Sequence, residues 1–413
     1  MGYDEPGRGE SVDREQPRRA AATLGPEDPP DGGAGRDRAD GESGRDRVGV
    51  HVAWESALAG KVVVLGLLLW LQSPQTLRGD GLRELLVGVV GLGLLALAAG
   101  LSLRTAAPNL AIGPVAVAAA LHFAEQGDRG VTEAVVPAAV FAAAGGLALA
   151  VFVVLLHVPA WAASLAGAAA VVAWIERRSV PVPVQADYDP RHSAYYLFAG
   201  FAAVAVLGGL FGAIRSVRRL VGRFRPVEDP ARRRGTVAGL VTVGALIGST
   251  VLATLAGVLL AANGSGRVVP DPGLDWTALG VGMALLGGTS AFGRRGGVSG
   301  TLLVVVLVGF LFAYVEAAGH EISRWAVAGA ALGVGLVVTR LVEAYGRPRP
   351  ATEDRPETTP VGDASISQGW ALPRAGSQAP WPPALPSNAA TEDPADPWRR
   401  WEGGPDRWRG DTR

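Results

Sequence analysis

The segment "ALLGGTSAFGRRGGVSGTLLVVVLVGFLF", Ala284 to Phe312, places a glycine-rich turn with two arginines between two apolar runs. A phosphate-binding P-loop would follow a β-strand and would end in a lysine followed by serine or threonine. This segment has no lysine, and the runs beside it predict apolar helices. We interpret the turn as a bend between half-helices inside a membrane bundle, where protein or a water-filled path satisfies the freed backbone groups.

Composition divides the chain into an apolar middle and two polar ends. The 413 residues include no cysteine, and the formal net charge is zero. Residues 1–50 contain eight arginines and twelve acidic residues. Because such sequence buries too little apolar surface to offset its ordering entropy, we predict disordered tails at 1–54 and 346–413. The apolar domain would cover 55–345. The lack of cysteine excludes disulfides and thiolate metal sites, and the neutral charge gives no reason to expect nucleic acid.

Ten apolar segments follow one another in the middle of the chain, and a membrane span needs roughly 20 mainly apolar residues. They cover 57–72, 82–103, 109–123, 133–158, 160–175, 195–214, 236–262, 276–290, 298–319 and 324–344. The third, interrupted by Gly113–Pro114, and the eighth are short. Long continuous runs exclude a β-barrel, whose strands alternate. We therefore predict an all-α polytopic membrane bundle of about ten spans, two of them broken by Gly or Pro.

Glycines four residues apart suit close helix–helix approach in membranes, although glycine is frequent throughout this chain. The two pairs are Gly208/Gly212 and Gly244/Gly248.

The placement of arginines in the loops predicts the orientation of the chain in the membrane. If the N-terminal tail is inside, the inner loops hold eleven arginines and the outer loops hold seven. Ten spans would then place both tails in the cytoplasm of a cell-membrane protein.

Three stretches carry a resemblance to a known family. The segment Leu285–Leu303 resembles the signature of permease subunits of ABC importers for ribose and related simple sugars, in the branched-chain amino acid/sugar permease superfamily. Asn109–Leu121 and Ser249–Asn263 are similar to two further segments of that family, in the same order. Asn109 stands where the family usually has aspartate. Ten spans is the family's usual number.

The resemblance implies a permease that carries no ATPase chemistry of its own. A separate ABC ATPase subunit would dock on the inner face, a second permease subunit would complete the pore, and an extracytoplasmic solute-binding protein would deliver a sugar-like solute. The alternatives are a branched-chain amino acid permease and a permease-like membrane scaffold that does not transport. A secondary transporter, which usually shows clearer charges in its spans, is the third choice.

The most basic segment, 215–235, is the predicted ATPase-coupling loop. Its stretch "VEDPARRRG" places acidic residues near the start of a short predicted helix and arginines near its end, which suits the helix dipole. The alternative is an anchor that binds anionic membrane lipid, and the two are compatible. The predicted coupling residues are Pro226, Glu228, Asp229, Arg232, Arg233 and Arg234.

Polar residues in the apolar segments are candidates for a solute pathway, because ionisable groups are rare and functional at membrane depth. Glu316 and His320 are four residues apart, so we expect them to share a helix face. The alternative is that these groups reach the interface and are solvated. The predicted pathway residues are Asn109, His122, Gly287, Gly288, Thr289, Ser290, Glu316 and His320. Glu316 and His320 alone are too few ligands for a zinc site. Hydrolase motifs are missing from the apolar segments. We therefore predict no metal, no cofactor and no enzymatic activity.

Overall fold

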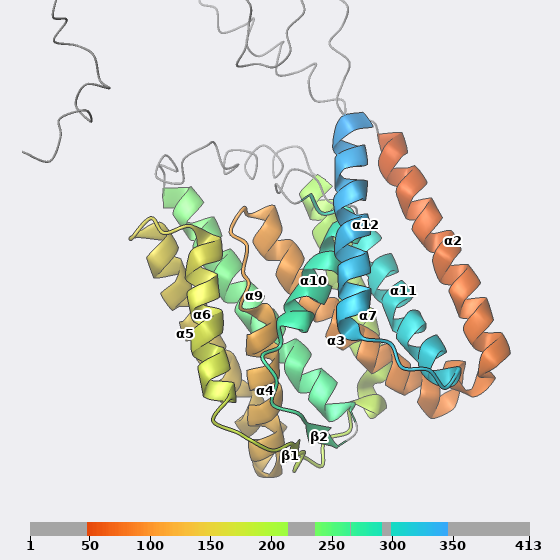
Figure 1. The fold of residues 1–413 in the computed structure, drawn as a ribbon, viewed down its shortest axis with the longest axis horizontal. Coiled ribbons are helices and arrows are strands. Elements are labelled where there is room, and N and C mark those ends of the chain that lie inside the picture. The colour runs from red at the N-terminus through yellow and green to blue at the C-terminus, as the bar shows by residue number, and fades with distance from the viewer. Residues whose placement is uncertain (1–47, 214–235, 265, 291–298, 346–413) are drawn as a thin grey trace, which may run out of the picture. The chain divides into compact units, whose positions relative to one another are not determined.

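The computed structural model describes residues 48–213, 236–264, 266–290 and 299–345, and it is mainly helical (Figure 1). The ten α-helices in this part of the chain are α2 (Val48–Gln72), α3 (Gly79–Arg104), α4 (Ile112–Gln126), α5 (Val131–Val154), α6 (Ala160–Ile175), α7 (Ala194–Ala213), α9 (Thr236–Ala262), α10 (Leu274–Leu286), α11 (Gly300–Ala317) and α12 (Arg324–Tyr345). Three short 3-10 helices are η1 (Pro74–Leu77), η2 (Gly127–Arg129) and η3 (Pro190–Ser193). The prediction of a helical bundle is confirmed at this level.

Seven described helices are long and apolar enough to cross a membrane: α2, α3, α5, the segment Pro190–Phe211 that contains α7, α9, α11 and α12. The helices α6 and α10 are apolar but shorter. Large apolar side chains face outwards, among them Phe141 at 75% exposure and Leu240 at 70%. Extensive exposed apolar surface is unfavourable in water. The helix lengths and this surface are therefore those of a membrane protein.

The helices differ from the sequence-based expectation at two places. Helix α2 begins at Val48, inside the segment predicted as a disordered tail over 1–54. The Gly113–Pro114 pair does not interrupt the third apolar segment, because α4 begins at Ile112 and holds Pro114 in its first turn. Proline is tolerated there, since the first backbone N–H groups of a helix have no partner within the helix.

The long helices α3 and α9 pack antiparallel. Gly91 of α3 lies against Leu260 of α9, and Leu101, later in α3, lies against Gly248, earlier in α9. The short helix α10 runs parallel to α3, because Gly280 lies against the backbone of Leu95 and Ala284 lies near Gly100. The other short helix, α4, packs against the long helix α9. The backbone of Ala116 in α4 fills the space beside Gly257 in α9. Each short helix therefore packs on the long helix of the other half of the chain.

The helices α3–α6 and α9–α12 form two units of the same plan. Each has a long helix, a non-helical segment, a short helix and two further helices. The contacts correspond as well, since α4 packs on α9 as α10 packs on α3, and α5 packs on α9 as α11 packs on α3. Because α3 and α9 are antiparallel, the two units run in opposite directions. Inverted repeats of this kind occur in many transporters.

Helix α2 runs parallel to α11 and is fastened at the start of that helix. The Glu55 carboxylate accepts hydrogen bonds from the backbone N–H of Ser299 at 3.1 Å and from its hydroxyl at 2.7 Å. Further along both helices, Gly66 lies against the ring of Phe310. The indole Nε1 of Trp54 donates to the carbonyl of Leu286 at 2.9 Å. Two adjacent residues of α2 therefore hold the end of α10 and the start of α11.

The predicted glycine pairs are only partly used. A Cβ atom at Gly208 or Gly244 would have no neighbour within 4 Å, whereas one at Gly248 would lie 2.9 Å from Leu101. The closest approach on α9 is at Gly257, where a Cβ would lie 1.9 Å from the backbone oxygen of Ala116. The four-residue spacing of Gly244 and Gly248 therefore pointed to a packed helix, α9, but not to the part of its surface where the closest packing occurs.

We expect Gly257→Ala to destabilise the bundle, because the added methyl overlaps a backbone oxygen that cannot move away alone. Overpacking of this kind costs about 1–3 kcal/mol. On the same helix, Gly244→Ala has open space and gains helix propensity of up to about 1 kcal/mol, so it should be neutral or stabilising. Thermal unfolding of both variants in detergent measures the difference. Equal midpoints would contradict the close approach of α4 to α9.

Candidate functional site

The first turns of the short helices α4 and α10 meet inside the bundle. A Cβ at Gly113 would lie 1.9 Å from the carbonyl oxygen of Gly273, so neither backbone could approach with a larger residue at Gly113. The Thr277 hydroxyl accepts a hydrogen bond from Gly113 N at 3.0 Å and donates to Leu110 O at 3.1 Å. One side chain of α10 thus satisfies two backbone groups at the start of α4.

Asn109, a predicted pathway residue, belongs to this same crossing. It is 2% exposed. Its Oδ1 accepts from the backbone N–H of Ala111 at 3.0 Å, and its Nδ2 donates to the Ser249 hydroxyl of α9 at 2.8 Å. Both ends of the amide are therefore bonded, and Asn109 holds the non-helical segment before α4 against α9.

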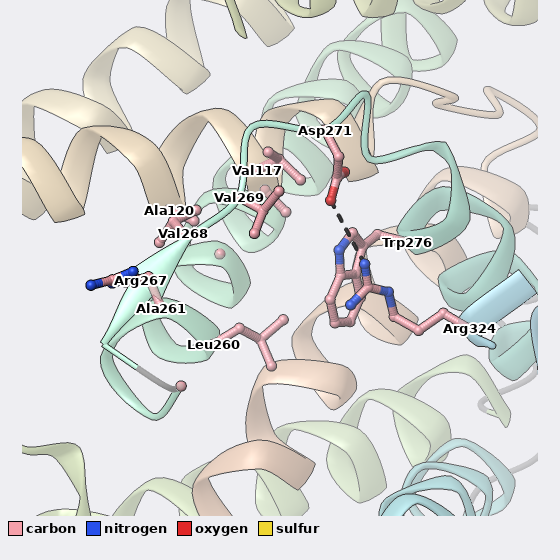
Figure 2. A pocket seen from close by; sticks show the side chains of 13 residues that line it. Val117, Ala120, Leu260, Ala261, Arg267, Val268, Val269, Asp271, Trp276 and Arg324 are labelled. Carbon is pink, nitrogen blue, oxygen red and sulfur yellow. Dashed lines mark ion pairs between the residues drawn. The ribbon is translucent and has the colours of Figure 1, made fainter. Parts of the chain in front are cut away.

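A cavity of about 300 Å³ lies between α4, α9, α10 and the first residue of α12 (Figure 2). This volume is at the lower end of the range for small-molecule sites, roughly 300–1,000 Å³. The lining residues are Ala116, Val117, Ala120, Gly257, Leu260, Ala261, Gly264, Arg267, Val268, Val269, Asp271, Trp276 and Arg324. The cavity is thus mainly apolar, with its polar groups at two places on its wall.

Charged and aromatic groups gather at one side of the cavity. The guanidinium of Arg324 lies over the ring of Trp276, 4.6 Å from its centroid. Its Nε donates to Asp275 Oδ2 at 2.6 Å, and its terminal nitrogen lies 3.7 Å from Asp271 Oδ2. In Figure 2, Arg267 lies on the far side of the cavity from Asp271, Trp276 and Arg324.

The segment before α10 positions the two carboxylates. Gly273, at φ +67°, forms the left-handed turn that precedes the helix, and its N–H donates to Asp271 Oδ1 at 2.7 Å. Asp275 stands in the first turn of α10, where a negative charge favours the helix dipole. Burial raises the pKa of the Asp271 carboxyl above its usual value, against the effect of the Gly273 N–H; Asp275 raises it further, and Arg324 lowers it.

A two-stranded strap borders the cavity. Strand β1 (Val182–Pro183) pairs antiparallel with β2 (Arg267–Val268), which contributes to the cavity wall. The Gln185 N–H donates to the carbonyl of Ala124 near the end of α4 at 3.1 Å. The long loop before α7 is therefore fastened both to the end of α4 and to the segment that carries Asp271.

The glycine-rich motif that follows α10 lies at the opposite end of that helix from the cavity residues. Helix α10 ends at Leu286 with Gly287 as its C-cap, Gly288 follows at φ +90°, and the N–H of Thr289 donates to Ala284 O at 3.0 Å. Gly287 and Gly300 are in close backbone contact, since a Cβ at Gly300 would lie 2.1 Å from Gly287 O. Thr289 and Ser290 are buried. The predicted bend between two helices is present up to Ser290; residues 291–298 lie outside the described residues.

The remaining predicted pathway residues lie elsewhere. His122 is on α4 and is half-buried. Glu316 and His320 are exposed, and they do not share a helix face, because α11 ends at Ala317 and Gly319 takes φ +69°. None of the predicted pathway residues lines the cavity. The predicted coupling residues Pro226, Glu228, Asp229, Arg232, Arg233 and Arg234 lie outside the described residues.

The sequence reasoning missed Asp271, Trp276 and Arg324. In the sequence, the stretch "PDPGLDWTALG", Pro270–Gly280, joins the gap after the apolar segment 236–262 to the start of the segment 276–290, and Arg324 is the first residue of the last apolar segment. Two aspartates beside a tryptophan at the start of a short helix were the available signal. Arg324, which completes the group, lies 48 positions after Trp276 in the sequence, so no local pattern connects them.

Comparisons with known proteins give no relative. No family model, no curated protein and no solved structure matches the chain.

We expect Arg324→Gln to destabilise the bundle, because it removes the cation beside Asp275, whose side chain is only 11% exposed. An uncompensated buried polar group costs about 1–3 kcal/mol, and a charged one more. In a double-mutant cycle, adding Asp275→Asn should recover part of this loss.

The matched control is Arg83→Gln. The side chain of Arg83 is 43% exposed, close to the 42% of Arg324, but its partner Asp80 is 83% exposed. Exposed pairs contribute about 0–1 kcal/mol, so this variant should unfold near the wild-type midpoint in detergent. Strict additivity of Arg324→Gln and Asp275→Asn would show that the pair is not coupled.

Proposed function

We propose that the chain is the transmembrane permease subunit of an ABC-type importer, which moves a small, sugar-like solute across the cell membrane. The observation that carries the proposal is the crossing of α4 and α10, where two short helices begin inside the bundle and belong to units of opposite direction. Discontinuous helices at the contact of inverted repeats are where transporters place their solute sites.

The cavity beside this crossing supports a solute-binding role. Its volume of about 300 Å³ admits a molecule of monosaccharide size, and it combines an apolar wall with the carboxylate of Asp271, the guanidinium groups of Arg267 and Arg324, and the indole of Trp276. Small-molecule sites usually have this composition, with a few polar groups that fix orientation. The sugar-like class comes from the sequence resemblance and the transport role from the fold.

The proposed assembly contains further subunits. An ABC ATPase would contact the loop 215–235, a second permease subunit would complete the pathway, and a solute-binding protein would deliver the solute at the β1–β2 end. Membrane lipid would surround the exposed apolar side chains of helices such as α5 and α9. The proposed orientation has ten spans and places both tails in the cytoplasm.

A permease-like scaffold is the second candidate. The specific observation in its favour is that the crossing is closed in this structure, since Asn109 and Thr277 are both fully engaged with the neighbouring backbone and with Ser249. A scaffold would keep the membrane topology and would not need an ATPase, so the co-purification experiment below separates the candidates.

We expect single cysteines to report both tails on the same side of the membrane. The chain has no native cysteine, so each reporter stands alone. A membrane-impermeant maleimide should label Asp128→Cys and Asp187→Cys in intact cells, because both positions are exposed in loops. Ser43→Cys and Ser365→Cys should react only after permeabilisation. Tails on opposite sides would exclude an even number of spans and overturn the proposed topology.

We expect an ATPase to co-purify with the full chain from native membranes, identified by mass spectrometry. Replacement of residues 228–234 by Gly and Ser should abolish this association, because it removes the charged groups of the proposed docking loop. The same replacement over residues 352–358, seven residues of the C-terminal tail, is the control and should retain the ATPase. Absence of an ATPase with the wild-type chain would favour the scaffold, and retention in the 228–234 variant would remove the docking assignment.

A further inference from the structure

The charges around Trp276 do not balance. Asp271 and Asp275 supply two carboxylates, and Arg324 is the one cation within ion-pair distance of them among the described residues. The bond of Arg324 to Asp275 is close, at 2.6 Å, whereas its terminal nitrogen is 3.7 Å from Asp271. Asp271, one-third exposed, is left without a close cationic partner. A negative charge at the cavity wall therefore remains only partly neutralised.

The side chain of Arg324 occupies the position that an organic cation would take. It lies over the face of Trp276 and beside Asp271 (Figure 2). It also pairs with the Asp275 carboxylate. An aromatic face attracts a cation through its quadrupole, and carboxylates form strong charge-assisted hydrogen bonds with ammonium and guanidinium groups. Trp276, Asp271 and Asp275 therefore offer the aromatic face and the negative charge that a cation needs, and the Arg324 side chain of the same chain contacts all three.

Arg324 is the most displaceable member of the group. It is the first residue of α12, it is 42% exposed, and residues 319–323 before it are also exposed. Asp275 and Trp276, by contrast, stand in the first turn of α10, which packs against α12 and α3. A competing ligand can therefore move the arginine towards solvent while the tryptophan and the carboxylates stay in place.

The rest of the cavity wall favours a ligand whose uncharged part is apolar. Val117, Leu260 and Val269 line it with apolar side chains. We propose that this cavity binds a small organic monocation, an ammonium or guanidinium group on a short apolar body, in competition with the side chain of Arg324. The cation takes the face of Trp276 and pairs with Asp271, and the body lies against the apolar wall.

The raised pKa of Asp271 is consistent with this assignment, because burial and the neighbouring Asp275 disfavour its charged form and a bound cation would favour it. This inference concerns the chemistry of the cavity itself and goes beyond the sugar-like class of the proposed function, which comes from the sequence resemblance alone. It rests on the proposed function only for the step from binding to transport. Binding itself is measured on the isolated chain, so its outcome is separate from that of the ATPase experiment.

The test is calorimetric binding to the purified full chain in detergent, with n-butylammonium as the probe. 1-Butanol, which has the same body without the charge, and D-ribose are the comparison ligands. We expect n-butylammonium to bind and 1-butanol not to bind. Asp271→Asn should weaken the binding of n-butylammonium by about tenfold or more, since it removes a charge-assisted hydrogen bond.

The direction in which Arg324→Gln changes the affinity for n-butylammonium distinguishes the proposal from a purely structural role of this arginine. Because the substitution removes the internal competitor and its positive charge, it should strengthen the binding of n-butylammonium, whereas a merely structural arginine would leave affinity unchanged or lower it. Asp128→Asn, at an exposed loop position outside the cavity, is the matched control and should leave affinity unchanged. Thermal unfolding identifies any variant that does not fold. If Asp271→Asn fails to fold, the wild-type comparison with 1-butanol and the Arg324→Gln result decide.

Three results would overturn the proposal. The first is equal binding of n-butylammonium and 1-butanol. The second is unchanged or weaker binding of n-butylammonium by Arg324→Gln. The third is binding of D-ribose that Asp271→Asn leaves intact while n-butylammonium does not bind, which would support a neutral sugar as the solute of the proposed permease.

Discussion

The crossing of α4 and α10 depends on satisfying backbone groups that are buried inside the bundle. A membrane interior tolerates non-helical backbone only where protein or a water-filled path provides partners. Here the Thr277 hydroxyl bonds both to Gly113 N and to Leu110 O, and the Asn109 amide bonds to the Ala111 N–H and to Ser249. Glycines at 113 and 273 allow the two backbones to come close enough for this. If either condition failed, the backbone groups at the start of α4 would lose these partners.

The same crossing determines the electrostatics of the cavity. The N-terminus of a helix carries a partial positive charge, and α4 and α10 bring two such ends together. At α10 this charge is offset by Asp275 in the first turn and by Asp271, which accepts the N–H of Gly273. A carboxylate or phosphate solute would therefore find this helix end already occupied by negative charge. On the wall that carries Asp271 and Trp276, the chemistry that remains free favours a donor or a cation, whereas Arg267 places a positive charge on the opposite wall.

Hydrophobic patterning predicted much of the fold and little of the site. The ten apolar segments correspond to ten helices, and the bend after Leu286 was visible as consecutive glycines. The packing faces were not visible, because a glycine pair such as Gly244/Gly248 shows only that close contact is sterically allowed, whereas the partner helix decides where it occurs. The cavity group was missed for a related reason. Arg324 reaches Asp275 and Trp276 only because α12 packs parallel to α10, and pairing between distant segments leaves no local pattern in one sequence.

Helix α10 connects the cavity to the N-terminal helix. Its first turn carries Asp275 and Trp276, and the carbonyl of its last residue, Leu286, accepts the indole N–H of Trp54. The adjacent Glu55 caps α11 through Ser299, whose own side chain makes no capping bond. A helix of 13 residues is about 20 Å long and behaves as a rigid rod. Any tilt of α10 would therefore move Leu286 relative to Trp54. Since α2 runs parallel to α11 and holds its first turn, both helices would have to follow that movement or break these hydrogen bonds.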